Sequence, residues 1–156
     1  MKIELWLVGK TDAWLAEGIE RYTKRMKHYA TFEMVVFPES RHKGNASPTQ
    51  VKAAEAEAIM VKLNDSDHLI LLDEHGKEVD SVAFAGYISK LMVAGKRKVI
   101  FLIGGAYGFD PVIVKRSNDT LSLSKMTFSH QVIRLLFMEQ LYRAHTIINN
   151  EPYHHQ

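Results

Sequence analysis

The sequence predicts a single α/β domain with a mostly parallel sheet and helices on both of its faces. Five short apolar or β-rich segments alternate along the chain with five segments that have helical spacing or helix-capping residues. No internal repeat, low-complexity tract or linker divides the 156 residues. We therefore expect one domain over residues 1–156 with one sheet at its centre.

The five predicted strands differ in how their residues indicate them. KIELWLVG and TFEMVVF are rich in residues that favour strands, and Pro38 ends the second. HLILLD and KVIFLIG are short apolar runs typical of buried strands, and DTLSLS is a shorter candidate. The expected strands are 2–9, 31–37, 68–73, 98–104 and 119–124. We expect a long loop over 38–48 and a turn in EHGKEVD, directly after the third strand.

The first two helices are indicated by periodicity and composition. Asp12 is the expected cap of a helix over 13–28. The residues spaced for its buried face are Trp14, Leu15, Ile19 and Tyr22. Either Ser47 or Thr49 begins a helix over 50–63, which is rich in Ala, Glu and Lys.

Capping residues indicate the remaining helices. Ser81 is the expected cap of a helix over 82–94 that ends at Gly95. Asp110 followed by Pro111 predicts a short helix ending near Asn118. The last helix is expected over 129–148, and it is apolar around most of its circumference. Such a helix must be largely buried, in a core or against a partner.

Composition excludes several classes of site. The chain has no cysteine, which excludes disulfides, Cys-ligated zinc and thiol nucleophiles and favours a cytoplasmic protein. No apolar run is long enough for a bilayer span, and the start has no signal-peptide pattern. The net charge is only +2. Basic residues gather within 21–28 and at Arg41, His42 and Lys43, as a solvated face or as a surface for RNA.

The stretch VIFLIGGAYGFD at 99–110 indicates a buried strand that ends in a glycine-rich loop. A dinucleotide site would need G-x-G-x-x-G after the first strand, and a phosphate loop would need G-x-x-x-x-G-K-[ST]. Neither pattern occurs, and neither do the H-E-x-x-H and G-x-S-x-G patterns. The loop is therefore either a plain tight turn or a site for a ligand without phosphate.

A second candidate site begins at LSLSKMTFSH, residues 121–130, where a strand leads into the last helix. The start of that helix offers unpaired backbone N–H groups. His130 and Arg134 share one helix face, and we interpret them as functional. Glu139 and Arg143 have the same spacing, which favours a structural ion pair. The eight histidines are scattered and give no compelling metal site.

Three motifs together closely resemble the RlmH family of SPOUT-class methyltransferases. They are LIGGAYGF, LSLSKMTFSHQVIRLLFMEQLYRA and NNEPYHH, and KIELWLVGK and LLDEHGK fit as well. The resemblance implies an S-adenosylmethionine-dependent homodimer that methylates N3 of a pseudouridine in helix 69 of bacterial 23S rRNA, with the assembled 70S ribosome as the expected substrate. It also implies a C-terminal trefoil knot that holds the cofactor, an exception to the usual absence of knots.

The resemblance assigns cofactor contacts to three loops. These contacts are Leu72, Gly104, Leu123, Ser124, Lys125, Met126, Thr127 and Phe128. We expect the absent Cβ atoms of Gly104 and Gly105 to make room for a bent cofactor. Met126 and Phe128 either wall the adenine or pack in the core. The family commonly has proline where this chain has Ser129, and serine is itself a competent helix cap.

The acceptor of such a reaction is an imide N3–H, which is a poor nucleophile until its proton leaves. A base, or a cation that stabilises the resulting anion, would assist. The candidate catalytic residues are His130, Arg134, Arg143, Tyr153 and His154. We expect a composite site in which the YHH tail, from the same subunit or from its partner, reaches over the cofactor. The alternatives are a catalytically impaired ribosome-binding or RNA-binding protein of the same fold and, disfavoured by the missing fingerprint, a dehydrogenase.

Overall fold

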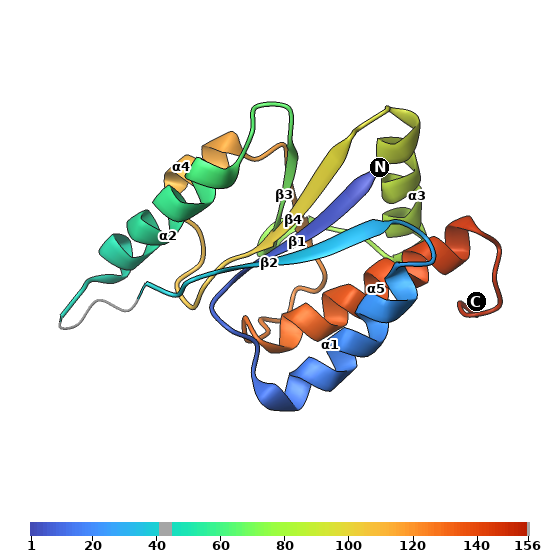
Figure 1. Cartoon of the computed structure of the whole chain (residues 1–156), viewed down its shortest axis with the longest axis horizontal. Coiled ribbons are helices and arrows are strands. Elements are labelled where there is room, and N and C mark those ends of the chain that lie inside the picture. The colour runs from blue at the N-terminus through green and yellow to red at the C-terminus, as the bar shows by residue number, and fades with distance from the viewer. Residues whose placement is uncertain (41–44, 156) are drawn as a thin grey trace.

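The protein is described by a computed structural model that covers residues 1–40 and 45–155 (Figure 1). The expected RNA contacts Arg41, His42 and Lys43 lie outside the described residues. The strands are β1 (Lys2–Val8), β2 (Thr31–Phe37), β3 (His68–Glu78), β4 (Lys98–Ile103) and β5 (Asp119–Ser122). The helices are α1 (Ala13–Met26), α2 (Pro48–Lys62), α3 (Ser81–Val93), α4 (Pro111–Arg116) and α5 (Val132–Ile148).

The five strands form one sheet in the order β2-β1-β4-β3-β5, and every neighbouring pair is parallel. Helices α1, α3 and α5 cover one face, and α2 and α4 cover the other (Figure 1). The α/β class with helices on both faces is therefore confirmed. A parallel sheet favours such helices, because the end of each strand must be connected back to the start of the next one, and this crossover is long enough to contain a helix.

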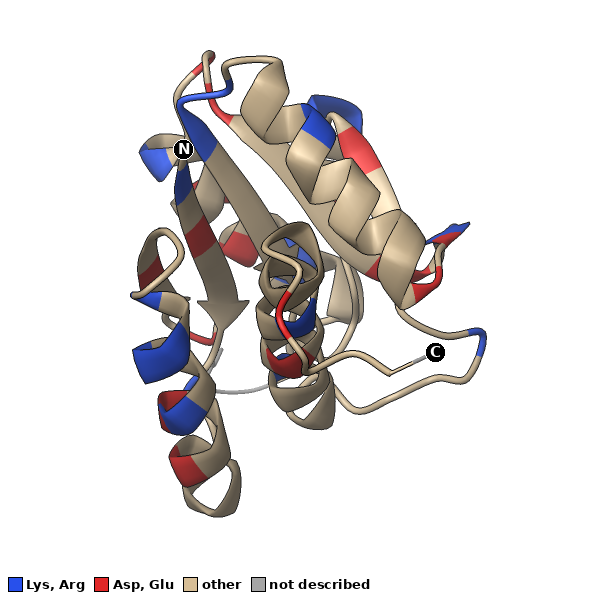
Figure 2. Cartoon of the chain, turned by 90° about the vertical axis from the view of Figure 1, so that its right-hand side faces the viewer, with Lys and Arg blue, Asp and Glu red and all other residues tan. Residues whose placement is uncertain are grey.

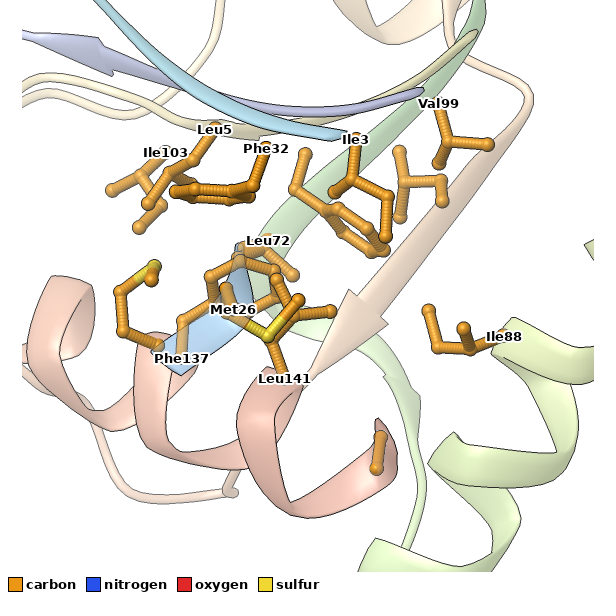
Figure 3. Close-up of a cluster of buried hydrophobic side chains, with 14 of the residues drawn as sticks. Ile3, Leu5, Met26, Phe32, Leu72, Ile88, Val99, Ile103, Phe137 and Leu141 are labelled. Carbon is orange, nitrogen blue, oxygen red and sulfur yellow. The ribbon is translucent and has the colours of Figure 1, made fainter. Parts of the chain in front are cut away.

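Each face of the sheet has its own apolar core. Ile3 and Leu5 of β1 point to the face covered by α1, α3 and α5, where Phe137 of α5 joins them (Figure 3). Trp6 and Val8 of the same strand point to the face covered by α2 and α4. Strand β1 is buried on both sides for this reason, which explains why its sequence is almost continuously apolar.

The structure corrects the predicted turn after residue 73. Strand β3 continues to Glu78 and pairs with β5 again after a register shift between Leu72 and Lys77. Gly76 makes this close pairing possible, because a Cβ built on it would lie 2.7 Å from the Leu121 carbonyl carbon. The residues EHGKE lack strand propensity, so the extended conformation is imposed by the neighbouring strand.

Trp14 was wrongly placed on the buried face of α1. Its side chain is 71% exposed, whereas Leu15, Ile19 and Met26 are buried. One residue along a helix rotates the side chain by about 100°, which takes Trp14 off the stripe that faces the sheet. Asp12 does occupy the N-cap position of α1, but its side chain accepts no capping hydrogen bond.

The other helix starts follow the predicted capping residues with one correction. Ser47, not Thr49, caps α2, where its side chain and that of Gln50 form a reciprocal capping box. Asp80 caps α3 in place of the predicted Ser81. Asp110 caps α4 as predicted, with Pro111 as the first helical residue.

Buried His145 on α5 predicts a pH-dependent stability. Its ring stacks on Tyr29, its Nε2 atom has no hydrogen-bond partner, and burial lowers its pKa from 6.5 to about 4. The unfolded chain therefore binds a proton between pH 6.5 and 4 that the folded chain does not. This difference lowers the free energy of unfolding as the pH falls through that window, by about 3 kcal/mol in total.

We expect His145→Phe, which retains an aromatic ring, to remove that part of the pH dependence measured by urea unfolding at several pH values. Exposed His28 provides a control, because His28→Phe should leave the slope between pH 6.5 and 4 unchanged. Parallel curves for the wild type and His145→Phe would contradict this prediction.

Candidate active site

A cavity of about 650 Å³ lies at the carboxyl ends of β4 and β5 and beside the middle of β3. The ends of parallel strands meet at one edge of a sheet, and ligands of α/β proteins bind at that edge. Three segments form the walls: the middle of β3 around Leu72, the loop after β4 and the loop between β5 and α5. This volume suits a cofactor-sized small molecule.

The wall from β3 includes three polar residues that the sequence analysis missed, Asp73, Glu74 and His75. The carboxylate of Asp73 accepts hydrogen bonds from the backbone N–H of His75 at 2.8 Å and from its Nδ1 atom at 2.9 Å. The signal was present in the sequence, since these residues directly follow the apolar run HLILL. It was passed over because EHGKEVD was interpreted as a simple turn.

The glycine-rich wall is a tight loop with its own internal contacts. Gly108 has a φ of 75°, which only glycine adopts without strain, and its N–H donates to the Gly105 carbonyl at 3.2 Å. A Cβ built on Gly104 would lie 3.0 Å from the Phe109 ring, and one built on Gly105 would lie 2.9 Å from both carboxylate oxygens of Glu55. Neighbouring groups of the protein therefore lie where a Cβ of Gly104 or Gly105 would be, a reason for glycine that the sequence analysis did not give.

The wall before α5 is shaped by serine hydroxyls. The Oγ of Ser122 donates to the carbonyl of Ser124, and the Oγ of Ser124 accepts from the N–H of Met126 at 2.9 Å. Such side-chain-to-backbone bonds fix an irregular loop without a helix or sheet ladder. Met126 is 73% exposed and Phe128 is 38% exposed, and both line the cavity. They are apolar walls of the cavity and not core residues.

Most of the residues that the resemblance assigned to the cofactor are brought together here. The cavity is lined by Leu72, Gly104, Leu123, Ser124, Met126, Thr127 and Phe128. Lys125 is not among the lining residues, and its Nζ lies 3.7 Å from a carboxylate oxygen of Glu78. Its assigned contact with the cofactor stays a prediction.

Among the candidate catalytic residues, only His130 lines the cavity. It lies at the start of the last helix, which begins later than predicted, at Val132. Ser129 accepts a hydrogen bond from the N–H of Val132 at 3.1 Å, so serine at this position does cap the first turn.

Arg134 is fully buried and does not itself line the cavity. Its guanidinium donates to the carbonyls of Val8 at 2.6 Å and Gly9 at 3.1 Å, and to Thr11 Oγ1 at 3.0 Å. Its Nε also donates to the carbonyl of His130 at 2.9 Å. Burial lowers the pKa of Arg134. The side chain ties the turn after β1 to the start of α5.

The remaining candidates form a second group, the tail cluster, which consists of Glu139, Arg143, Tyr153 and His154. The Arg143 guanidinium bonds Glu139 at 2.5 Å and His154 Nδ1 at 3.2 Å, and it lies 4.7 Å from the centre of the Tyr153 ring. The predicted Glu139–Arg143 ion pair is therefore present. The C-terminal tail is docked on α5 and on α1. The hydroxyl groups of Tyr22 on α1 and Tyr153 in the tail form a hydrogen bond at 3.4 Å.

Hydrogen-bond chemistry fixes the protonation state of several members of the tail cluster. A guanidinium can only donate, so the Nδ1 atom of His154 accepts and its Nε2 atom carries the proton. The hydrogen bond with Glu139 raises the pKa of Arg143 further. Burial raises the pKa of Tyr153, which keeps its hydroxyl protonated at neutral pH. The cluster thus contains a guanidinium paired with Glu139, a Tyr153 hydroxyl that donates to the same carboxylate at 3.2 Å, and an imidazole N–H.

The tail cluster and the cavity lie at different places along α5. Ile133 lines the cavity, and Arg143 is about 15 Å further along the helix axis at 1.5 Å per residue. Figure 1 shows the C-terminal tail beside the far end of α5, away from the start of that helix. Within one chain, therefore, the structure does not bring Arg143, Tyr153 and His154 to the cavity.

Over residues 1–40 and 45–155, no group of three or more His, Asp or Glu side chains is arranged to hold a metal ion. None of the helices in these same ranges has the length and apolar character that a bilayer span requires.

The all-parallel sheet and the cavity at its carboxyl edge are typical of ligand-binding α/β proteins. A family model described as "Predicted SPOUT methyltransferase" matches residues 1–154. Proteins named "Ribosomal RNA large subunit methyltransferase H" from Parabacteroides distasonis and Porphyromonas gingivalis are each 49% identical over 157 residues, covering 100% of both chains. The one from Cytophaga hutchinsonii is 51% identical over 156 residues, or 99% of this chain and 100% of its own. The chain belongs to the RlmH family of SPOUT methyltransferases.

Proposed function

We propose that the protein is an S-adenosylmethionine-dependent methyltransferase of the cytoplasm that methylates N3 of a pseudouridine in helix 69 of 23S rRNA, on the assembled 70S ribosome. The observation that carries the proposal is the cavity. Residues from three separate segments that the family resemblance assigned to the cofactor line it together. The names of the relatives support the large-subunit rRNA as the substrate.

The residues of the cavity fit the chemistry of this cofactor. Bound S-adenosylmethionine supplies a methyl group on a sulfonium, whose C–S bond breaks as the N–C bond forms. Met126 and Phe128 offer apolar surface for an adenine ring, and the loop backbones at Gly104 and Leu123 offer hydrogen-bonding groups. The carboxylates of Asp73 and Glu74 suit a ligand that carries positive charge. Holding donor and acceptor in line is a main source of rate for such a transfer.

The tail cluster contains groups suited to the other half of the reaction, which is the loss of the N3–H proton from the acceptor. The N3–H proton must leave before or during methyl transfer, and the negative charge then spreads over the ring oxygens. Arg143 and the protonated hydroxyl of Tyr153 can stabilise that charge. His130, at the cavity, is the candidate for taking the proton. His154 can only donate, because its Nδ1 atom accepts from Arg143 and its Nε2 atom carries the proton.

Because the tail cluster lies away from the cavity of its own chain, we propose a homodimer in which the tail of one subunit completes the cavity of its partner. A long apolar helix in a domain of this size favours such an assembly, and Leu136 of α5 is exposed along with Trp14 of α1. The trefoil knot implied by the family resemblance is part of the same proposal.

We propose that the basic end of α1 contacts the rRNA. Figure 2 shows the blue bands of lysine and arginine toward the C-terminal end of α1, where Arg21, Lys24 and Arg25 lie. Lys24 forms an exposed ion pair with Glu20 at 2.7 Å, which is weak enough to exchange for a phosphate. The chain is small for an enzyme that recognises a ribosome, so both subunits are expected to contribute.

The experiment that tests this function is the transfer of a labelled methyl group from S-adenosylmethionine to ribosomes. We expect the label on 70S particles, at one pseudouridine of helix 69, after mapping of the modified nucleotide. Cofactor binding without any transfer to 70S particles or large subunits would favour the alternative, a catalytically impaired ribosome-binding protein. Binding of NAD in place of S-adenosylmethionine would contradict both.

A further inference from the structure

A buried carboxylate lies directly behind the glycine-rich wall of the cavity. Glu55 is on α2, on the face of the sheet opposite α5, and it is only 6% exposed. It borders a small void together with Gly104, Gly108 and Phe109, which are three residues of that wall. None of the chemistry proposed above uses this side chain.

The contact between Glu55 and the loop is close and specific. The three atoms nearest to a Cβ built on Gly105 all belong to the Glu55 carboxylate, and both oxygens would be 2.9 Å away. The missing side chain of Gly105 would therefore point toward α2 and not into the cavity. Glycine at this position lets the loop backbone rest against the carboxylate, while its other side lines the cavity.

Burying the carboxylate of Glu55 is electrostatically unfavourable. Burial raises the pKa of Glu55, the charge of Glu39 raises it further, and a hydrogen bond from the backbone of Ser40 opposes these effects. A buried acid is normally disfavoured in a core. Here it joins two segments far apart in the sequence, namely the chain after β2 and the loop after β4.

We propose that Glu55 is a positioning residue that holds the Gly104–Phe109 loop in its cofactor-binding conformation. The inference rests on the proposed function and deepens it, because it assigns the support of the cofactor site to a residue on the opposite face of the sheet. Removing the carboxylate leaves a void behind the loop, so the loop moves away from the cavity and cofactor affinity falls.

The test measures the Kd of S-adenosylmethionine by calorimetry, together with the Tm of each variant. We expect Glu55→Ala to weaken binding about ten-fold, and Glu55→Gln, which retains the volume and an acceptor, to stay within about three-fold of the wild type. Glu57 is exposed on the same helix, so Glu57→Ala is the matched control and should leave the Kd unchanged. All Kd values are compared well below each Tm, so a merely structural loss lowers the Tm without changing the Kd.

A second variant tests the same contact from the other side and leaves α2 intact. Gly105→Ala places a Cβ against the carboxylate, so we expect about ten-fold weaker binding. In Gly105→Ala/Glu55→Ala the carboxylate is gone, and binding should be no weaker than in Glu55→Ala alone. Effects that multiply to about a hundred-fold would overturn the inference, because independent sites add in free energy.

The outcomes separate this inference from the function on which it rests. A wild-type protein that does not bind S-adenosylmethionine would overturn the proposed function. A wild-type protein that binds it, together with equal Kd values for Glu55→Ala and Glu57→Ala, would overturn only the role of Glu55. If Glu55→Ala does not fold, Gly105→Ala decides the question, and a Kd equal to that of the wild type in this variant would overturn the inference.

Discussion

A heterodimer of two inactive subunits is expected to regain methyl transfer. Arg143→Ala removes the cation of the tail cluster and should lower turnover about 100-fold while cofactor affinity stays within a few-fold. His154→Ala should act in the same direction. Gly104→Val should abolish cofactor binding, since its side chain crowds the Phe109 ring and the Gly108 carbonyl. Each homodimer is therefore inactive for a different reason.

Co-expression with two affinity tags allows the Arg143→Ala/Gly104→Val heterodimer to be purified. If the tail completes the partner's cavity, one of its two sites combines an intact cavity with an intact tail. The dimer should then show about half of the wild-type turnover. If each tail served its own chain, both sites would be defective and no activity would return.

Two controls make the result interpretable. A heterodimer of wild-type and Arg143→Ala subunits should also have about half of the wild-type turnover, which verifies that the two sites act independently. Light scattering should give the mass of a dimer for every variant at micromolar concentration. A monomeric wild-type protein would contradict the composite site before any assay of activity.

Arg134→Met is expected to lower the free energy of unfolding by about 3 kcal/mol or more. The guanidinium is the donor for the carbonyls of Val8, Gly9 and His130, and methionine of similar length would leave these acceptors buried without it. Arg134→Lys keeps the charge but not the planar fork, so it should recover only part of the loss. Chemical denaturation measures both differences.

Exposed Arg21 provides the matched control, because Arg21→Met removes the same charge from α1 and should change stability by less than about 0.5 kcal/mol. The experiment also decides the role of Arg134. A variant that keeps the wild-type stability and loses turnover would show that Arg134 acts in catalysis, as the sequence analysis predicted. Loss of stability would show that it positions the turn after β1.

The predicted helices and strands that the structure confirmed are those indicated by residues close together in the sequence. Asp110 with Pro111 indicates a helix start within one turn, and α4 begins there. Ser47, one of the two caps predicted for the second helix, is the cap of α2. The strand 98–104 was right to within a residue because its apolar run matches what a parallel sheet buries. The edge strand 31–37, most of whose residues are not buried, was found from its β-branched and aromatic residues. The predicted turn over 74–80 failed for the opposite reason, since its extended form depends on pairing with β5.

The candidate site likewise has parts that local sequence motifs predicted and parts that they did not. LIGGAYG and LSKMTF could be recognised as loops for one cofactor, and the structure brings their residues to a single cavity. The pairing of Glu55 with Gly105, and the burial of Arg134 beneath the turn after β1, had no sequence signal. Both join segments separated by dozens of residues, and spacing within one segment carries no information about such contacts.

The amino-acid sequence alone therefore determined the α/β class and the order of the elements, because apolar periodicity and capping act over a few residues. The family resemblance carried by its motifs indicated the segments that line the cavity. Only the tertiary structure decided which of the conspicuous polar residues share a site. His130 lies at the cavity, Arg134 inside the core and Arg143 with the docked tail, although all three are on or beside one helix. A helix presents its residues to different neighbours around its circumference and along its length, so their surroundings depend on how the whole chain packs.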